Sequence, residues 1–389
     1  MNKFLSFFPK SFIIRYKGFY QTGVIKSEIF FYSLFTKRVD NILLAKSKLL
    51  ARNFKWKDKQ PLKVVGVFSV NNWESIFIEA LGELGSFVHI TWPHIQKFFI
   101  KKSDWLVRRK ELNLFIQDEF QKHYNEEVNM IVFIYSSDFI INQETIAFMK
   151  RKNVMVISFC WDDLLYYKGK VNGQLVGINL LSRMVDWNLT LSPEAIPRYN
   201  FHHSACFFWQ GMPITSSVSE SLPGNASSDL EFYVLFIGSK YGWRANFLES
   251  LQKKGIQIRC FGSGWENGTL DKQQMELEIR KAPITIGFAG VGYTQSITTI
   301  KGRDFEVPIL GGLYLTQYSA GLEKIYDIDR EVLCYTNLED CFKKICAVRD
   351  NEVWADSIRL AGYKKAIKTC SWSSRIKYLQ YLINLTAAA

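Results

Sequence analysis

The sequence has no long apolar run and no clean export signal. Nothing in its 389 residues approaches the roughly 20 consecutive apolar residues that a helix needs to cross a bilayer. The first residues interleave Lys and Arg with Phe and Tyr, and they lack an apolar core followed by a small-residue cleavage site. These absences predict a protein that stays in the cytoplasm.

Cysteine and histidine are too scattered to predict a metal site. Seven Cys occur without any Cys-x-x-Cys spacing, mostly beside apolar residues, which fits reduced thiols in a core. Among five His, the only cluster is His202-His203, and neighbouring residues of a strand point to opposite faces. No Asp-x-Asp motif stands in a convincing metal site either. We therefore expect neither a metal nor a cofactor.

Composition and length indicate two ordinary globular domains. Apolar residues make up 48% of the chain and charged residues 22%, which excludes a disordered or collagen-like protein. The chain is too long for one average domain and long enough for two, each with its own core.

The net charge of +12 is concentrated at the amino terminus. Residues 1–60 contain 13 Lys or Arg and 3 Asp or Glu, so the rest of the chain carries only +2. This distribution argues against a nucleic-acid-binding core. It predicts a basic, aromatic leader that faces something anionic.

Residues 61–214 are predicted to form a first α/β domain. Short apolar or β-rich runs alternate there with segments of helical spacing. The predicted strands are 62–70, 86–91, 130–135 and 154–159, and the predicted helices are 73–84 and 143–150. Continuous apolar strands are typical of a parallel sheet that helices cover on both faces.

Residues 231–371 are predicted to form a second domain of the same class, after a Ser/Gly/Pro-rich linker over 215–230. The predicted strands are 232–237, 256–261 and 284–288, and the predicted helices are 243–253 and 275–281. Ligands of such doubly wound sheets bind at the carboxyl ends of the strands, so two of them predict a site in a cleft between domains.

The most informative segment runs from Lys301 to Glu323. It contains Arg-x-Phe-Glu-x-Pro, a Gly-Gly turn and an apolar strand that ends in Thr-x-Tyr. This arrangement closely resembles the CgeB-like glycosyltransferases, of the spore-maturation-protein type, in the group-1 superfamily. The resemblance covers residues 231–375, with further matches at 236–244, 261–265 and 331–340. It covers the first domain loosely, through 159–163 and 186–190.

The resemblance implies a GT-B fold with two Rossmann-like domains facing a cleft and an amphipathic helix, 372–386, that crosses back to the first domain. It also implies an enzyme that moves a sugar from a nucleotide-diphosphate donor to a hydroxyl of a glycan or lipid-linked acceptor. The reaction would serve the assembly of bacterial surface polysaccharide or glycoconjugate. The nucleotide-sugar is then a substrate, and the fold is typically metal-independent.

Three residues near the start of this segment are implied to bind the donor. Glu306 would accept hydrogen bonds from ribose hydroxyls, as an ionised carboxylate does well. Lys301 and Arg303 would neutralise the diphosphate. Simpler interpretations stay open, since a Glu is favoured near a helix amino terminus and either cation can be plain surface charge.

Four loops supply the other residues that the resemblance implies for the donor. They are Gly238, Ser239 and Arg244 after the first strand of the second domain, Gly262 and Trp265 after the next, Gly290, Gly292 and Tyr293 after the third, and the Gly311-Gly312 turn. Trp265 can stack on the base or simply pack. The Gly290 loop can close over the donor or form a plain tight turn.

One departure from the superfamily concerns Thr298-Thr299. The paired-glutamate motif places its first Glu near Thr298, so that contact to the donor sugar has no carboxylate here. The resulting alternative is a non-catalytic sugar- or nucleotide-binding protein on a GT-B frame. A Rossmann oxidoreductase is excluded because residues 67–73 have no Gly-x-Gly-x-x-Gly after the first strand.

The first domain offers Asp162, Asp163 and His89 as candidate catalytic bases. The two Asp follow a strand end, where a carboxylate can deprotonate an acceptor hydroxyl in an inverting mechanism. The alternative is that the pair caps the helix that follows. His89 lies near the end of the second strand.

The leader is predicted to dock on an anionic membrane surface. One helical face carries apolar residues, cations line its flanks, and further Phe precede it. These are Phe35, Val39, Ile42, Leu43, Leu49 and Leu50 on the face, Lys37, Arg38, Lys48 and Arg52 on the flanks, and Phe4, Phe7, Phe8, Phe12 and Phe19 upstream. The alternative is that this stripe packs against the first domain.

Overall fold

The structure is a computed structural model of the chain. It describes residues 10–36, 39–69, 74–92, 104–135, 140–166, 169–171, 174–209 and 231–387. The predicted linker and Phe4, Phe7, Phe8, Lys37 and Arg38 of the predicted leader lie outside these residues. The chain forms two compact units. Unit 1 comprises residues 1–27 and 210–371, and unit 2 comprises residues 28–209 and 372–389.

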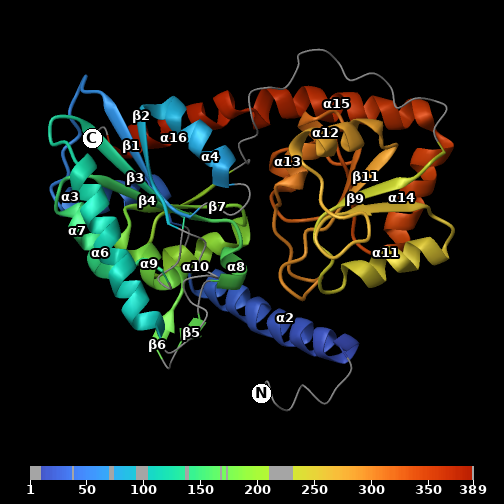
Figure 1. Cartoon of the computed structure of the whole chain (residues 1–389), viewed down its shortest axis with the longest axis horizontal. Helices are drawn as coiled ribbons and strands as arrows, with labels where there is room; N and C mark the ends of the chain where they lie inside the picture. Colours follow the sequence, from blue (N-terminus) through green and yellow to red (C-terminus); the bar gives the residue numbers. More distant parts are fainter. Residues whose placement is uncertain are drawn as a thin grey trace. The chain divides into compact units, whose positions relative to one another are not determined.

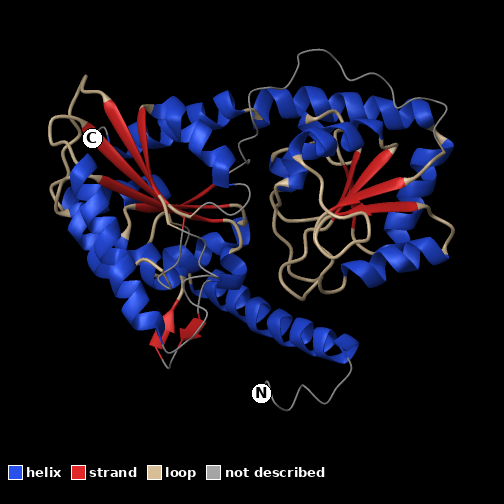
Figure 2. Cartoon of the chain, viewed as in Figure 1, coloured by secondary structure: helices blue, strands red, loops and turns tan. Residues whose placement is uncertain are grey.

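Unit 2 is built on a sheet of six parallel strands in the order β2-β1-β3-β4-β7-β8. Figure 2 draws the strands of the chain in red. The strands are β1 (Leu62–Val67), β2 (Ser86–Ile90), β3 (Asn129–Tyr135), β4 (Met155–Cys160), β7 (Trp187–Thr190) and β8 (Cys206–Phe208). β4 is buried along its whole length, as expected for a parallel strand covered on both faces. A small antiparallel pair, β5 (Gly169–Val171) and β6 (Gln174–Val176), stands apart from this sheet.

Helices cover both faces of this sheet (Figure 1). The helices of unit 2 are α3 (Asn41–Ala51), α4 (Glu74–Leu84), α6 (Trp105–His123), α7 (Gln143–Lys150), α8 (Asp163–Tyr166), α9 (Ile178–Met184) and α10 (Ile196–Phe201), with a short 3-10 turn η2 (Pro193–Ala195). Apolar side chains of α6, α7 and α9 form one core with β1, β2, β3 and β4. Gly85, between α4 and β2, has to be Gly because a Cβ there would lie 2.1 Å from the Leu62 carbonyl oxygen.

The carboxyl-terminal helix α16 (Trp372–Ala387) belongs to unit 2. It packs on α4 (Figure 1) and on α3, and its residues Leu379, Leu382 and Ile383 are buried. The Tyr378 hydroxyl donates to the carbonyl of Phe208 at 3.4 Å. The predicted return of this helix to the first domain is therefore confirmed.

Unit 1 carries a sheet of five parallel strands in the order β10-β9-β11-β12-β13. They are β9 (Val234–Ile237), β10 (Ile258–Phe261), β11 (Ile284–Gly287), β12 (Tyr314–Gln317) and β13 (Leu333–Tyr335). The helices are α11 (Arg244–Lys253), α12 (Lys272–Lys281), α13 (Arg303–Ile309), α14 (Leu338–Asp350) and α15 (Glu352–Cys370), with the 3-10 turn η3 (Leu322–Lys324). Helix α12 begins at a capping box between Asp271 and Gln274.

The described residues of the predicted leader contain two helices. Helix α2 (Lys10–Phe35) divides between the units at Ser27, and α3 follows in unit 2. No helix in the described ranges is both long enough and apolar enough to span a membrane.

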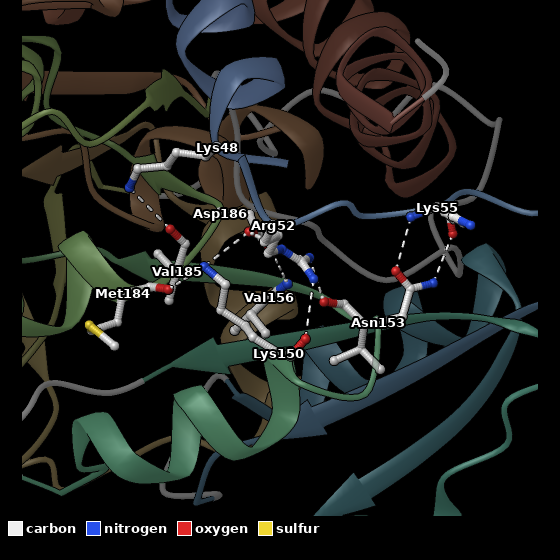
Figure 3. A network of polar contacts seen from close by, with 10 residues as sticks. Lys48, Arg52, Lys55, Lys150, Asn153, Val156, Met184, Val185 and Asp186 are labelled. Carbon is white, nitrogen blue, oxygen red and sulfur yellow. Dashed lines mark hydrogen bonds and ion pairs between the residues drawn. The ribbon is translucent and has the colours of Figure 1, made fainter. Parts of the chain in front are cut away.

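Lys48 of α3 and Arg52, which follows the end of that helix, lie inside a polar network of unit 2 (Figure 3). The fully buried Asp186 pairs with Arg52 at 2.9 Å and with Lys150 at 3.3 Å. Asp186 also accepts the Val156 N–H, and the Lys48 ammonium donates to the carbonyl of Val185 at 3.2 Å.

This network corrects the predicted membrane role of Lys48 and Arg52. Burial and the neighbouring Lys150 lower the pKa of Lys48 to about 8, while Asp186 acts in the opposite direction. Leu49 is buried as well, so this part of the apolar stripe packs inside the unit, whereas Leu43 and Leu50 are exposed.

Candidate active site

The strand order of unit 1 places a switch point beside β9. The chain leaves β9 for β10 on one side and then returns to β11 on the other. Ligands of open parallel sheets bind at the carboxyl ends of the strands where the order reverses in this way. The loops that follow β9, β10 and β11, together with the amino terminus of α13, all lie at this edge.

The loops after β9 and β10 are held together at Gly238. The Trp265 indole N–H donates to the Gly238 carbonyl at 2.8 Å, and the Lys240 N–H donates to the Ser263 carbonyl at 2.8 Å. Gly262 has φ +124°, and a Cβ there would lie 2.5 Å from the Gly238 oxygen. The Lys240 ammonium lies 4.8 Å from the centre of the Trp265 ring. Trp265 therefore fixes the loop, and Lys240 places a cation beside it.

Arg244 begins α11 close to the same loop. Its guanidinium lies 4.2 Å from the centre of the Tyr241 ring and 6.0 Å from that of Phe288. One guanidinium N–H donates to the Ser239 carbonyl at 3.4 Å. The predicted residues Ser239 and Arg244 are thus brought together beside the end of β9.

Glu306 and Arg303 form an ion pair on the first turns of α13. Arg303 also donates to the Ile237 carbonyl at 3.3 Å and to the Met275 sulfur at 3.1 Å. The structure therefore directs Arg303 to Glu306 and to the end of β9. In this arrangement Arg303 positions the carboxylate that was predicted to bind ribose.

Asp304 is a site residue that the sequence did not reveal. It is fully buried, accepts the Lys301 N–H at 2.6 Å and accepts the Thr316 hydroxyl at 3.0 Å. Burial raises its pKa to about 6, although these hydrogen bonds and one from Tyr314 act against the shift. Asp304 ties β12 to the backbone of Lys301 and so fixes the loop that precedes α13. In the sequence, the only sign that Asp304 belongs to the site is its place as the variable residue of the Arg-x-Phe-Glu-x-Pro motif.

The glycine loop after β11 is shaped by close contacts. A Cβ at Gly290 would lie 2.6 Å from the Thr294 oxygen, and Gly292 has φ +59°. Gly290 pairs with Thr298 in an isolated antiparallel bridge. Tyr293, at the tip, is exposed. The Thr298 position therefore lies beside the switch-point loop, where this chain has a hydroxyl in place of a carboxylate.

Gly311 and Gly312 lie away from this edge. They follow the carboxyl end of α13, where the Gly312 N–H donates to the Val307 carbonyl at 2.9 Å, and both are buried. The chain then enters β12 at its amino end. These two glycines close the helix and lead into the strand, and the structure does not bring them to the other predicted donor residues.

In unit 2, Asp163 is fully buried and cannot meet an acceptor. Its carboxylate accepts the Tyr199 hydroxyl at 3.0 Å, and its carbonyl accepts from Arg198 at 2.7 Å. Burial raises its pKa to about 6, while Thr190, Arg198 and Tyr199 oppose the shift. This is a correction, because Asp163 begins α8 as part of the core. Asp162, at the preceding turn, is partly exposed and keeps access to solvent.

His89 lies in β2 at the edge of the sheet. Its Nε2 is 2.9 Å from the Phe68 carbonyl oxygen, so that nitrogen carries a proton, and its ring is 4.6 Å from that of Phe68. Burial lowers its pKa. β2 and β4 are separated by β1 and β3 in the sheet. At the usual spacing between strands, His89 therefore lies roughly 14 Å from β4, the strand that precedes Asp162.

No three His, Cys, Asp or Glu side chains in the described residues gather as metal ligands would. The Asp-x-Asp pair at Asp327 and Asp329 forms ion pairs instead. Asp327 contacts Arg330 and Asp329 contacts Lys344.

Residues 244–381 match a family model described as glycosyl transferase-like. The matched segment is less than half of the chain and contains Arg244, Lys301, Arg303 and Glu306. Comparison with curated proteins gives no match.

Solved structures that resemble the chain cover most of it. The catalytic domain of starch synthase IV from Arabidopsis thaliana, bound to ADP and acarbose, superposes with a TM-score of 0.58 and 10% identity, over 85% of this chain and 100% of that one. The chain has the GT-B fold. Sucrose-phosphate synthase from Thermosynechococcus elongatus gives a TM-score of 0.56 and 12% identity over 85% and 100% of the two chains. HepE from Anabaena, in complex with UDP, gives a TM-score of 0.52 and 8% identity, over 83% of this chain and 99% of that one. These structures show the fold of the chain.

Proposed function

We propose that this protein is a glycosyltransferase that moves a sugar from a nucleotide-diphosphate donor to a hydroxyl acceptor. The observation that carries the proposal is the Arg303–Glu306 pair at the switch point of unit 1. It lies within the segment that matches the glycosyl transferase-like family. Glu306 is partly exposed, so its carboxylate can accept hydrogen bonds from the ribose of a nucleotide.

The donor site is proposed to hold the diphosphate with side-chain cations. Lys240 lies on the loop between β9 and α11, Arg244 begins α11, and Lys301 precedes α13. As the bond between the anomeric carbon and the diphosphate oxygen breaks, that oxygen keeps the electron pair and these cations offset the charge. Two of the structures that resemble this chain are complexes with UDP and with ADP, which supports a nucleoside diphosphate as the common portion of the donor.

The acceptor hydroxyl is proposed to lose its proton to a base while its oxygen bonds to the anomeric carbon. Asp162, which follows β4 and is partly exposed, is the base in this proposal. The resemblance to CgeB-like enzymes supports a glycan or lipid-linked acceptor in bacterial surface polysaccharide or glycoconjugate assembly. It also supports a cytoplasmic, metal-independent reaction.

Release of nucleoside diphosphate from a panel of activated sugars tests this function. We expect one donor to be turned over in the presence of an acceptor mixture, with the same rate after EDTA treatment. Nucleotide binding without turnover of any donor would favour the non-catalytic alternative, to which the absent Glu at Thr298 already points. Loss of activity with EDTA would overturn the metal-independent version alone.

A further inference from the structure

Helix α2 presents a wide apolar face to solvent. Phe19 is 82% exposed, Phe30 67% and Leu34 63%. The exposed large apolar residues of this helix are Phe19, Tyr20, Val24, Phe30, Phe31, Leu34 and Phe35. Scattered exposed apolar residues are normal in soluble proteins, but seven within 17 positions of one helix form a contiguous patch that needs a partner.

The opposite face of α2 is fixed to unit 2 at its carboxyl-terminal end. Glu28 pairs at 2.9 Å with Arg198, whose side chain is only 2% exposed. Tyr32 is buried, and its ring lies 5.1 Å from that of Phe201 in an edge contact. Because these contacts occupy the inner face, the helix cannot turn its aromatic residues inward without breaking a buried ion pair.

The part of α2 that belongs to unit 1 contacts the glycine loop after β11. The Tyr293 N–H donates to the Gln21 side-chain oxygen at 2.9 Å, and the hydroxyls of Thr22 and Thr294 are hydrogen-bonded. A Cβ at Gly18 would lie 2.4 Å from the Tyr293 oxygen. The helix therefore lies directly against the loop that follows β11.

The charge of α2 complements an anionic surface. Its cations are Lys10, Arg15, Lys17 and Lys26, and Lys26 is exposed. Its one acidic residue, Glu28, is already paired with Arg198. Arg52 pairs with Asp186, and Lys48 donates to the carbonyl of Val185, so these two leader cations are directed into unit 2.

We propose that the exposed face of α2 binds an anionic lipid bilayer, lying in the interface with its aromatic side chains inserted and its cations at the headgroups. The membrane contact that was predicted for the whole leader is thereby assigned to helix α2 alone. The docking goes beyond the proposed sugar transfer and does not depend on it. If both hold, the glycine loop at the switch point lies close to the membrane that would carry a lipid-linked acceptor.

Co-sedimentation with vesicles tests the proposal. The probes are phosphatidylcholine vesicles and vesicles with a rising fraction of phosphatidylglycerol. We expect binding of the full chain to increase with the anionic fraction, and the triple variant Phe19→Asp/Phe30→Asp/Leu34→Asp to bind at least about tenfold more weakly. The matched control replaces three exposed apolar residues on other helices, Leu114→Asp/Leu277→Asp/Val353→Asp, and should bind as the wild type does.

Binding that ignores lipid charge, or that survives the α2 triple variant, would overturn the proposal. So would a chain that binds no vesicles but forms a dimer that the triple variant disrupts, because the occupant would then be a second copy. Circular dichroism shows whether each variant is folded. Nucleotide affinity without vesicles is measured separately, so failure of docking and failure of the proposed function remain distinguishable.

Discussion

Arg303 binds the Glu306 carboxylate one helical turn away and also donates to the Ile237 carbonyl at 3.3 Å. The guanidinium thereby connects the carboxylate to the carboxyl end of β9, where the strand order of unit 1 reverses. A planar group with several donors can make both contacts at once. Glu306 is therefore held at the switch point before any nucleotide binds.

Arg303→Lys should weaken nucleotide binding although it keeps the charge. A single ammonium group cannot reproduce the contacts to Glu306, Ile237 and Met275 together. We expect the Kd for the nucleoside diphosphate to rise about tenfold, measured by calorimetry. Arg280→Lys is the control, because Arg280 forms an i,i+4 pair with Glu276 on α12. Equal affinities for the wild type and Arg303→Lys would remove the positioning role.

Asp304→Asn should change the pH dependence of stability. The pKa of Asp304 is about 6 in the folded protein against 3.8 for an ordinary Asp, so between about pH 4 and pH 6 the folded state holds a proton that the unfolded state has lost. The free energy of unfolding therefore falls as pH rises through this window.

The Asn side chain does not titrate, so in this variant the free energy of unfolding should no longer show the decrease due to Asp304, which is on the order of 2 kcal/mol. Denaturant unfolding at pH 4, 5, 6 and 7 measures it. The exposed Asp118→Asn is the control and should keep the wild-type profile. An unchanged profile in Asp304→Asn would show that the buried carboxyl does not titrate in this range.

Gln21→Ala should loosen the glycine loop after β11. The variant removes the acceptor of the Tyr293 N–H, a bond whose loss costs about 1 kcal/mol. Hydrogen exchange at the Tyr293 amide should accelerate about fivefold, as followed by mass spectrometry of peptides covering 288–296. Tyr20→Ala, on the exposed face of α2, is the control. Unchanged exchange would mean that α2 does not hold this loop.

Asp186→Asn should strongly destabilise unit 2. The carboxylate is fully buried between Arg52 and Lys150, and its loss leaves both cations without their partner. Removal of one member of such a cluster typically costs about 3 kcal/mol or more in the free energy of unfolding. Denaturant unfolding checks this, with the exposed Asp58→Asn as a control. A cost below about 1 kcal/mol would contradict the importance of the network.

The fold could be predicted because its signals are local. The helix over 143–150 has the predicted bounds, and the apolar runs that became β3 and β4 are within one residue of prediction. Helix α6 was not predicted, since its 19 residues are rich in charge and show little apolar periodicity.

The details of the site depended on contacts between distant residues. Arg52 meets Asp186 across 134 positions and Gln21 meets Tyr293 across 272, so neither pairing is visible in the sequence. Asp163 looked accessible because it follows a strand end, but the core closes over it. From composition alone, every cation of the leader was expected at the surface. The packing of α3 shows that Lys48 instead donates to the carbonyl of Val185 inside unit 2, unlike the cations of α2.

The central claim is that Glu306 belongs to a nucleotide site, and calorimetry with UDP and ADP on the wild type and Glu306→Ala tests it most directly. We expect the wild type to bind at least one of the two nucleotides. Glu306→Ala should then show no measurable binding while it stays folded by circular dichroism. Glu276→Ala, which breaks an ion pair on α12, should bind as the wild type does. Wild-type affinity in Glu306→Ala would contradict the account.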